Sequence, residues 1–169
     1  MATGEKSRMF RTQVDIPAEK REPLVEMLNQ SVADTLDLYS HAKQAHWNLK
    51  GREFFQLHEL TDKLAAELIE VVDDLAERAT SLGGYVFGTV RMAAQATALP
   101  EYPSDLIDGL DHVSALVERV GQYANRIRSA IDASDDLGDK STADLYTEIS
   151  RMIDQQLWFL EAHLQGEKE

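Results

Sequence analysis

Histidine and carboxylate side chains recur at one-turn spacing within residues 54–82, a stretch that has the apolar pattern of a long helix. His58 and Asp62 are four residues apart, and so are Asp73 and Glu77. Side chains at this spacing lie on the same face of a helix, so each pair can share a metal ion. The chain has no cysteine, which leaves nitrogen and oxygen atoms as the ligands available to a metal.

The two pairs are too far apart along one helix to surround a single ion. Asp62 and Asp73 are separated by eleven residues, or about 16 Å of helix, whereas metal–ligand bonds are about 2 Å long. If a second copy lies antiparallel across this face, with a two-fold axis near Ala66 and Ile69, the His/Asp pair of each copy meets the Asp/Glu pair of the other. His46, on the preceding helix, can add a further ligand to each of the two sites.

The candidate ligands are two imidazoles and three carboxylates, at His46, His58, Asp62, Asp73 and Glu77. This set suits iron, manganese or zinc better than copper(I) or calcium. Carboxylates stabilise the more highly charged ferric state, which favours oxidation of Fe(II). A salt-bridged contact between two copies, without a metal, explains the same spacing equally well. The spacing alone therefore predicts a contact between copies and leaves its chemistry open.

The elements that carry these residues are predicted to be helices. Glycine and proline are few, 9 and 4 among 169 residues, and apolar residues recur at helical spacing in four long segments. The predicted helices run from Pro17 or Pro23 to Leu49, from Phe54 to Leu82, from Ser104 to about Ile131, and from about Ser141 to Leu164, with a turn over 132–140. A short helix around Arg91–Thr97 is expected in the connection 85–103, because structureless connections of this length are uncommon. This order predicts an all-α fold, a ferritin-like four-helix bundle with a short helix between its second and third helices.

The histidines lack the motif that places two irons inside a single bundle. Such bundles use Glu-x-x-His on two helices. The residues three positions before the five histidines are Leu38, Lys43, Phe55, Gly109 and Leu160. A di-iron centre within one bundle is therefore not expected, which again favours a site shared between copies.

The bulk properties exclude some partners. The net charge of −13 repels duplex DNA and attracts cations, although an acidic surface also serves solubility alone. No apolar run approaches the roughly 20 residues of a membrane span, and the first residues lack the apolar core of a signal peptide. We therefore expect no membrane contact and a cytoplasmic location. Residues 1–16 are predicted to be a flexible N-terminal tail, 17–165 the bundle domain and 166–169 a short C-terminal tail.

Several stretches form a combination that is specific when taken together. They are KQAHWNLKG at 43–51, LHEL at 57–60 followed by Asp62, DDLAER at 73–78, Gly88-Thr89, and TADL at 142–145 continuing to Asp154 and LWFLE at 157–161. This combination resembles the Dps family, the mini-ferritins, over roughly residues 20–165. The resemblance implies a hollow dodecamer that oxidises Fe(II) with hydrogen peroxide or oxygen and stores ferric mineral inside. It implies ferroxidase sites at two-fold interfaces, with ligands at His46, His58 and Asp62 of one subunit and Asp73 and Glu77 of the next.

The resemblance also implies roles around this site. Trp47 matches a tryptophan close to the iron, although packing at the contact between copies explains it equally well, and Lys43 matches a lysine near the site. Glu59 is a candidate for nucleating mineral on the inner wall, but Lys63 departs from a strongly acidic inner surface. Iron enters the family's shells through acidic pores at three-fold axes. The candidates for such a pore, which a solvated acidic turn explains equally well, are Asp135, Asp136, Asp139 and Asp144.

DNA binding is the property in which this sequence departs from the family. Members that bind DNA usually do so through a lysine-rich tail, whereas residues 1–11 carry Lys6, Arg8 and Arg11 against Glu5. On a surface of net negative charge this excess is small, so we expect weak or no DNA binding at physiological salt. The alternative function is a DNA-protecting structural shell with a minor or non-catalytic metal site.

Overall fold

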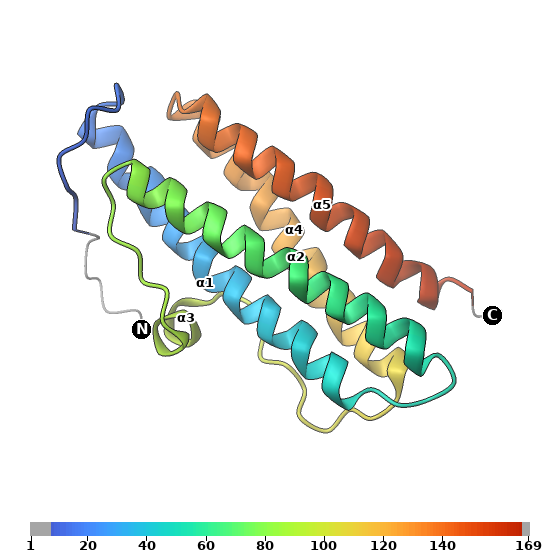
Figure 1. The fold of residues 1–169 in the computed structure, drawn as a ribbon. Coiled ribbons are helices and arrows are strands. Elements are labelled where there is room, and N and C mark those ends of the chain that lie inside the picture. The colour runs from blue at the N-terminus through green and yellow to red at the C-terminus, as the bar shows by residue number, and fades with distance from the viewer. Residues whose placement is uncertain (1–7, 167–169) are drawn as a thin grey trace.

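Long antiparallel helices form the body of the molecule in the computed structural model, which describes residues 8–166 (Figure 1). The helices are α1 (Ala18–Asn48), α2 (Phe54–Ser81), α3 (Val90–Ala96), α4 (Gly109–Asp136) and α5 (Lys140–Leu164). Within the described residues there is no strand, only an isolated bridge between Lys50 and Asp108. No helix of this part of the chain is long and apolar enough to cross a membrane. The predicted all-α bundle with a short helix in the long connection is confirmed.

Two helix hairpins build the bundle: α1 packs along α2, and α4 packs along α5 (Figure 1). Helix α2 buries a regular stripe of leucines, among them Leu57, Leu64, Leu68 and Leu75, all at 1% exposure or less. This one-sided stripe leaves the opposite face of α2 free to carry polar residues, because side chains three and four positions apart share a face.

The structure shows which of the two predicted starts α1 uses. It also shows that the predicted bounds of α4 are wrong. Helix α1 begins directly after Pro17, so Pro23 lies inside it. The prediction that the third long helix begins at Ser104 is wrong, because α4 begins at Gly109, where the side chain of Asp108 accepts a hydrogen bond from the Leu110 N–H. Its predicted end near Ile131 is also wrong, since α4 continues to Asp136.

The segment before α4 is held by backbone hydrogen bonds rather than by helix. The Lys50 N–H donates to the Ile107 carbonyl at 2.9 Å, and the Gly109 N–H donates to the Lys50 carbonyl at 2.8 Å. At the other end of α4, Gly138 has φ +83° and makes the turn into α5. Glycine adopts this backbone conformation without the cost that a side chain would add.

Residues 8–16 contact the bundle although they are not helical. The Phe10 N–H donates to the Gly83 carbonyl at 2.6 Å, and the Arg21 guanidinium donates to the carbonyls of Ile16 and Leu82 at 2.9 and 2.7 Å. Met9 and Ile16 also pack against the core. The bundle thus holds more of the N-terminal segment than the sequence predicts for a flexible tail. The rest of that predicted tail, 1–7, and residues 167–169 of the C-terminal tail lie outside the described residues.

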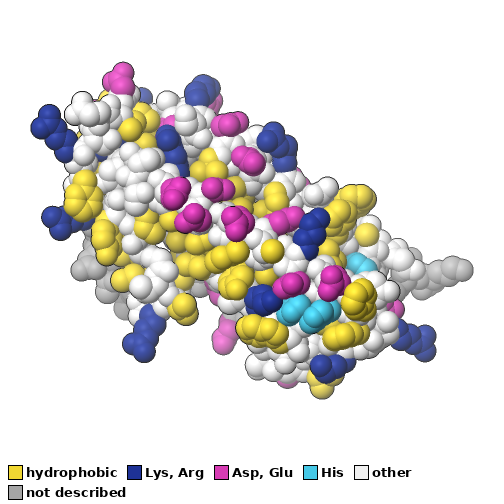
Figure 2. Space-filling model, viewed as in Figure 1, with side chains coloured by type: hydrophobic (Ala, Val, Ile, Leu, Met, Phe, Trp, Pro, Cys, Tyr) yellow, Lys and Arg dark blue, Asp and Glu magenta, His cyan; other side chains and the backbone are white. Residues whose placement is uncertain are grey.

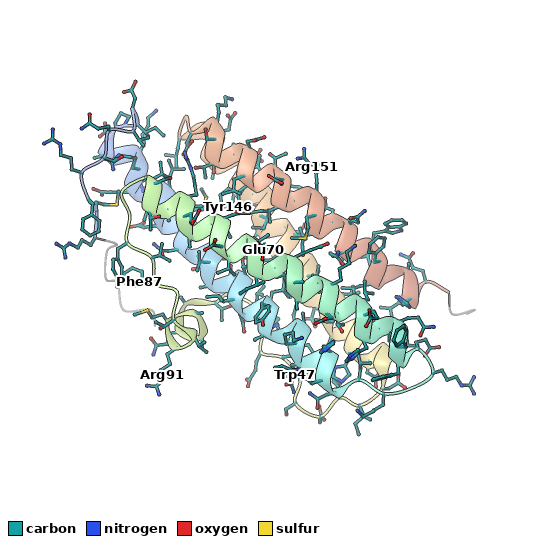
Figure 3. All side chains as sticks on the ribbon, in the orientation of Figure 1. Trp47, Glu70, Phe87, Arg91, Tyr146 and Arg151 are labelled. Atoms are coloured by element: carbon teal, nitrogen blue, oxygen red, sulfur yellow. The ribbon has the colours of Figure 1, made fainter. Side chains whose placement is uncertain are left out.

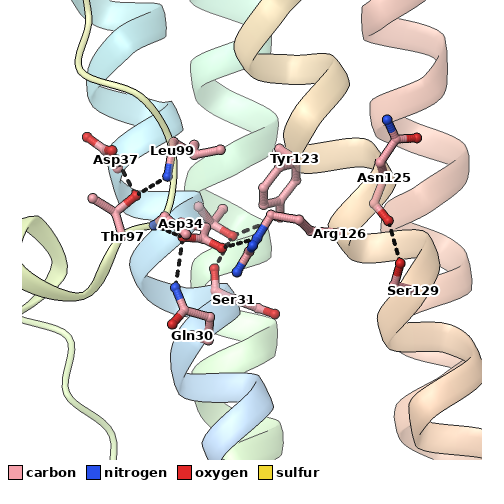
Figure 4. A network of polar contacts seen from close by, with 12 residues as sticks. Gln30, Ser31, Asp34, Asp37, Thr97, Leu99, Tyr123, Asn125, Arg126 and Ser129 are labelled. Carbon is pink, nitrogen blue, oxygen red and sulfur yellow. Dashed lines mark hydrogen bonds and ion pairs between the residues drawn. The ribbon is translucent and has the colours of Figure 1, made fainter. Parts of the chain in front are cut away.

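A buried carboxylate joins α1, α4 and the segment after α3 (Figure 4). Asp34 is 2% exposed. It accepts hydrogen bonds from Arg126 Nε at 2.9 Å, from Gln30 Nε2 at 3.0 Å and from the Ala98 N–H at 2.8 Å. A buried charge must be paired and hydrogen-bonded in this way to be tolerated. This network fixes the path of the long connection across the bundle.

Candidate metal centre

Two histidines face each other where α1 ends and α2 begins. The rings of His46 and His58 are stacked, with centroids 3.7 Å apart and planes at 19°. His46 Nδ1 lies 2.9 Å from the His58 carbonyl, and His58 Nδ1 lies 3.0 Å from the His46 carbonyl. Because a carbonyl oxygen can only accept, each Nδ1 carries the hydrogen, and Nε2 of each neutral ring keeps its lone pair. Hydrogen bonds of this kind orient histidine ligands in metal sites.

The end of α1 supplies one of these acceptors. His46 lies in the last turn of α1, where backbone carbonyls have no partner inside the helix. The chain then reverses within a few residues, using Gly51 at φ +120°, and this tight return brings His58 opposite His46. The Phe54 ring lies 5.2 Å from the His58 ring on α2. The helix end and the short loop therefore fix the positions of both rings.

Asp62 lies one turn beyond His58 and faces solvent. Its Oδ1 is 2.7 Å from Lys43 Nζ and 3.9 Å from His46 Nε2. The hydrogen bond from Lys43 is the main cause that holds the pKa of Asp62 below its ordinary value. The side chain is 57% exposed, so the charged carboxylate keeps oxygen lone pairs that no other group among residues 8–166 uses. His46, His58 and Asp62 thus form one cluster at this end of the bundle.

Asp73 and Glu77 lie on the same helix, farther along, and both are exposed. Between them and the cluster lie exposed Ala66 and Ile69, the latter 40% exposed. In Figure 2, histidine and acidic side chains gather at one end of this face, and apolar side chains separate them from further acidic ones. Among residues 8–166, no group of three or more histidines and acids is placed to hold a metal ion. Within one subunit, Asp73 and Glu77 therefore lie apart from the cluster of His46, His58 and Asp62.

Large aromatic side chains are exposed beside the histidines. Trp47 is 64% exposed and lies on the outside of α1, with Lys43 Nζ 5.8 Å from its ring centroid (Figure 3). Phe54 and Phe55 are 41% and 67% exposed. Apolar surface gathered beside polar residues is typical of protein–protein contacts. These exposed aromatic side chains fit a face that a second subunit covers.

Comparison with known proteins identifies the family of this chain. Residues 25–168 match the family described as the ferritin-like domain. A DNA protection during starvation protein from Agrobacterium fabrum is 45% identical over 158 residues, which cover 94% of this chain and 98% of the relative. The chain belongs to the Dps family. The resemblance seen in the sequence is thereby confirmed.

Solved structures of Dps proteins superimpose closely on this chain. DpsC from Streptomyces coelicolor has a TM-score of 0.89 at 31% identity, with 95% of this chain and 94% of that chain covered. The Dps protein from Vibrio cholerae, described as a member of the ferritin-like diiron-carboxylate superfamily, has a TM-score of 0.85 at 25% identity, with 93% and 98% covered. The ferritin-like bundle thus extends over nearly the whole chain, as in other Dps proteins.

The four aspartates predicted to line a Dps pore differ in their surroundings. Asp135, Asp136 and Asp144 are exposed. Asp139 is 3% exposed, and both of its oxygens lie 2.8 Å from Arg78 Nη2. It also caps α5 by accepting from the backbone N–H groups at the start of that helix.

Asp139 is therefore corrected from a pore candidate to a structural residue inside the subunit. Burial acts to raise the pKa of its carboxyl group, but hydrogen bonds from Thr142 and Arg78 outweigh burial and lower that pKa. The sequence signal for this role was an aspartate directly before a helix start, in the turn that precedes Lys140. The remaining candidate, Glu59, is exposed on α2, and the nearby Lys63 pairs with Glu67 at 3.7 Å.

Sequence reasoning gave no role to two buried histidines of this Dps subunit. His41 and His112 are 4% and 2% exposed. Both contact the ring of Tyr102, which follows α3 in the long connection. No spacing signal links a residue of a connection to two helices, so this cluster could be found only in the fold.

Proposed function

We propose that this Dps-family chain is the subunit of a dodecameric shell that oxidises Fe(II) at sites shared by two subunits and stores the ferric product. The observation that carries the proposal is the stacked histidine pair, whose Nε2 lone pairs are both free beside the exposed carboxylate of Asp62. Asp73 and Glu77 of an antiparallel second copy supply the remaining ligands. The apolar strip at Ala66 and Ile69 then lies on the two-fold axis.

Iron is the substrate of this reaction, and the protein binds and positions it. His46 and His58 act as neutral nitrogen donors for Fe(II), and three carboxylates favour the ferric state by their charge. Two ferrous ions at one site give two electrons to hydrogen peroxide, which is thereby reduced to water without release of hydroxyl radical. Oxygen is the alternative oxidant, and zinc or manganese can compete for the same ligands.

Acidic residues outside the shared site support the transport and storage steps of the proposal. Asp135, Asp136 and Asp144 are exposed and can line a negatively charged entry pore between subunits. Glu59 projects from α2 as a candidate for nucleating ferric mineral. The pore and nucleation roles are both proposed from exposure and charge. Replacing the aspartates by asparagine and Glu59 by glutamine tests these roles, because the rate of iron uptake should fall.

The test is to add Fe(II) without oxygen, then hydrogen peroxide, and to follow ferric absorption by stopped flow. We expect oxidation faster than that of free Fe(II), and size-exclusion chromatography should show a large assembly. Asp62→Ala should remove the acceleration and leave the assembly intact. Equal rates with and without the protein would rule out the ferroxidase function, and a stable monomer would rule out the shared site.

Protection of DNA is the second candidate function, favoured by the name of the Agrobacterium relative. The described part of the N-terminal segment carries Arg8 and Arg11, while the whole chain has a net charge of −13. Because phosphate contacts by cations dominate DNA affinity, we propose that the shell does not bind duplex DNA at physiological salt. A gel-shift assay at low and moderate salt decides this: persistent retardation at moderate salt contradicts the proposal.

A further inference from the structure

Tyr102 is half-buried and contacts polar side chains of two helices, His41 of α1 and His112 and Arg119 of α4. Its hydroxyl oxygen is 2.7 Å from His112 Nδ1, and the two rings are stacked with centroids 6.0 Å apart. The His41 ring lies 5.2 Å from the Tyr102 ring. The guanidinium carbon of Arg119 lies 5.4 Å from the same ring centroid. His41, His112 and Arg119 are each 4% exposed or less.

The hydrogen bond between Tyr102 and His112 runs from phenol to imidazole. Burial lowers the pKa of His112, against smaller opposing effects from the Leu106 backbone and from Asp111 and Asp108, so the ring is neutral at pH 7. Burial also raises the pKa of Tyr102, so the phenol keeps its proton. A phenol O–H is a much better donor than the N–H of a neutral imidazole, and a neutral imidazole has one nitrogen free to accept. We therefore assign the shared hydrogen to Tyr102 in the resting state.

The core tyrosines Tyr123 and Tyr146 provide a contrast. The Thr35 hydroxyl donates its own hydrogen to the Ser31 carbonyl at 2.6 Å, so Tyr123 must donate to Thr35 Oγ1, at 2.8 Å. In the same way, the Ser31 hydroxyl donates to the Met27 carbonyl, and Tyr146 donates to Ser31. An alcohol oxygen is not a base that can take up a proton near pH 7, whereas the imidazole of His112 is.

Loss of an electron from Tyr102 must be accompanied by loss of its proton. The Arg119 charge lies against the ring, and a positive ring beside a guanidinium is strongly disfavoured. Transfer of the phenolic hydrogen to His112 Nδ1 avoids a charged ring and yields a neutral tyrosyl radical beside an imidazolium. Asp108 and Asp111 stabilise that imidazolium, because they favour the charged form of His112.

We propose that Tyr102 is a one-electron donor to the iron site and that His112 takes up its proton as it is oxidised. The inference rests on the proposed ferroxidase function. His41 lies between the two places along α1: its ring contacts Tyr102, and five residues separate it from His46, about 7.5 Å along the helix axis.

The donor is needed when a site holds a single Fe(II). Reduction of one hydrogen peroxide to two waters takes two electrons and two protons from solvent. Fe(II) gives one electron and becomes Fe(III), and Tyr102 gives the other. The Tyr102 proton moves to His112 and returns when a second Fe(II) reduces the radical. Without this donor, the single electron from Fe(II) would split peroxide into hydroxide and a hydroxyl radical.

The experiment uses the assembled protein loaded without oxygen with one Fe(II) per site, mixed with hydrogen peroxide and frozen rapidly for electron paramagnetic resonance. We expect the signal of a neutral tyrosyl radical in the wild type. The signal should be lost in Tyr102→Phe and retained in Tyr123→Phe, the matched control for a buried tyrosine. Trapped hydroxyl radical should rise in Tyr102→Phe and stay at the wild-type level in Tyr123→Phe. His112→Gln should lower the radical yield, because an amide cannot take up the proton.

A parallel measurement with two Fe(II) per site separates this inference from the proposed function. There Tyr102→Phe should oxidise iron at the wild-type rate, since iron supplies both electrons. Accelerated oxidation together with no tyrosyl signal, or with the same signal in Tyr102→Phe, overturns the inference and leaves the ferroxidase function intact. Absence of acceleration in the wild type overturns the ferroxidase function and, with it, a donor to that site.

Discussion

The two ends of α2 use aspartates in opposite ways. At its start, Asp62 is exposed, and within the described part of the chain Lys43 is its close partner and His46 a more distant one. Beyond its end, Asp139 is buried, with both oxygens held by Arg78 and by the start of α5. A carboxylate with unused lone pairs at a surface can exchange its partner for a metal ion. A carboxylate whose lone pairs are filled inside the fold cannot. Charge alone therefore does not make a carboxylate a candidate metal ligand, because a ligand also needs oxygen lone pairs that the fold leaves unused.

The histidines show the same difference. His46 and His58 use Nδ1 on backbone carbonyls and leave Nε2 free at a surface. His41 and His112 are enclosed among protein groups, where His41 Nε2 lies 3.2 Å from Asp37 and His112 Nδ1 contacts Tyr102. The first pair is suited to bind a substrate ion that arrives from outside, and the second to exchange protons within the fold.

We call the start of α2, with His46, His58 and Asp62, the open end, and the region beyond its end, with Arg78 and Asp139, the closed end. The largest expected effect on activity is at the open end. His58→Ala removes a proposed ligand and the ring that stacks on His46, while the backbone carbonyl that His46 bonds to remains. The rate of Fe(II) oxidation by peroxide should therefore fall by about a hundredfold or more. Glu26→Ala is the control, since Glu26 is exposed on α1 and lies twenty residues before His46, about 30 Å along the helix. Stopped-flow ferric absorption measures both. A wild-type rate in His58→Ala would show that the stacked pair is a packing feature.

Mutations at the closed end should lower the stability of the fold rather than the rate of iron oxidation. Arg78→Ala leaves the buried carboxylate of Asp139 without its cation, which should cost about 2 kcal/mol, less than for a fully buried pair because Arg78 is 22% exposed. For a domain of this size that is roughly 4–8 °C in the thermal midpoint. Circular dichroism measures the midpoint, with Arg151→Ala on exposed α5 surface as the control. An unchanged midpoint would contradict a structural role for the ion pair.

The same ion pair makes stability depend on pH in a defined direction. The pKa of Asp139 is lower in the folded chain than in the unfolded one, so its contribution is complete above the ordinary aspartate pKa of about 3.9. It is lost as the pH falls from there through the folded-state pKa. The difference in thermal midpoint between wild type and Asp139→Asn should therefore shrink as the pH falls below about 4. The exposed Asp136→Asn should show no such convergence, and a constant difference for Asp139→Asn would refute the assignment.

The sequence predicts the open end better than the closed one. The ligand spacing of His58, Asp62, Asp73 and Glu77 follows from helix geometry, which is local and regular. The role of Asp139 depends on Arg78, which is 61 residues away along the chain, and periodicity carries no information about such a pair. The start of α4 was missed for a similar reason, because the segment before Gly109 bonds to the loop at Lys50 instead of continuing as helix.

The smallest expected effect concerns Lys43, the lysine that forms an ion pair with Asp62. Because the Lys43 ammonium bonds to the same oxygen that a metal would use, Lys43→Met should strengthen anaerobic Fe(II) binding by up to about fivefold, the range of an exposed ion pair. Lys63→Met is the matched control, since Lys63 pairs with Glu67 on the same helix and should leave the affinity unchanged. Isothermal titration calorimetry measures both variants. A weaker affinity in Lys43→Met would show instead that the lysine orients Asp62 for the metal. Lys43 would then hold Asp62 in place at the open end, as Arg78 holds Asp139 at the closed end.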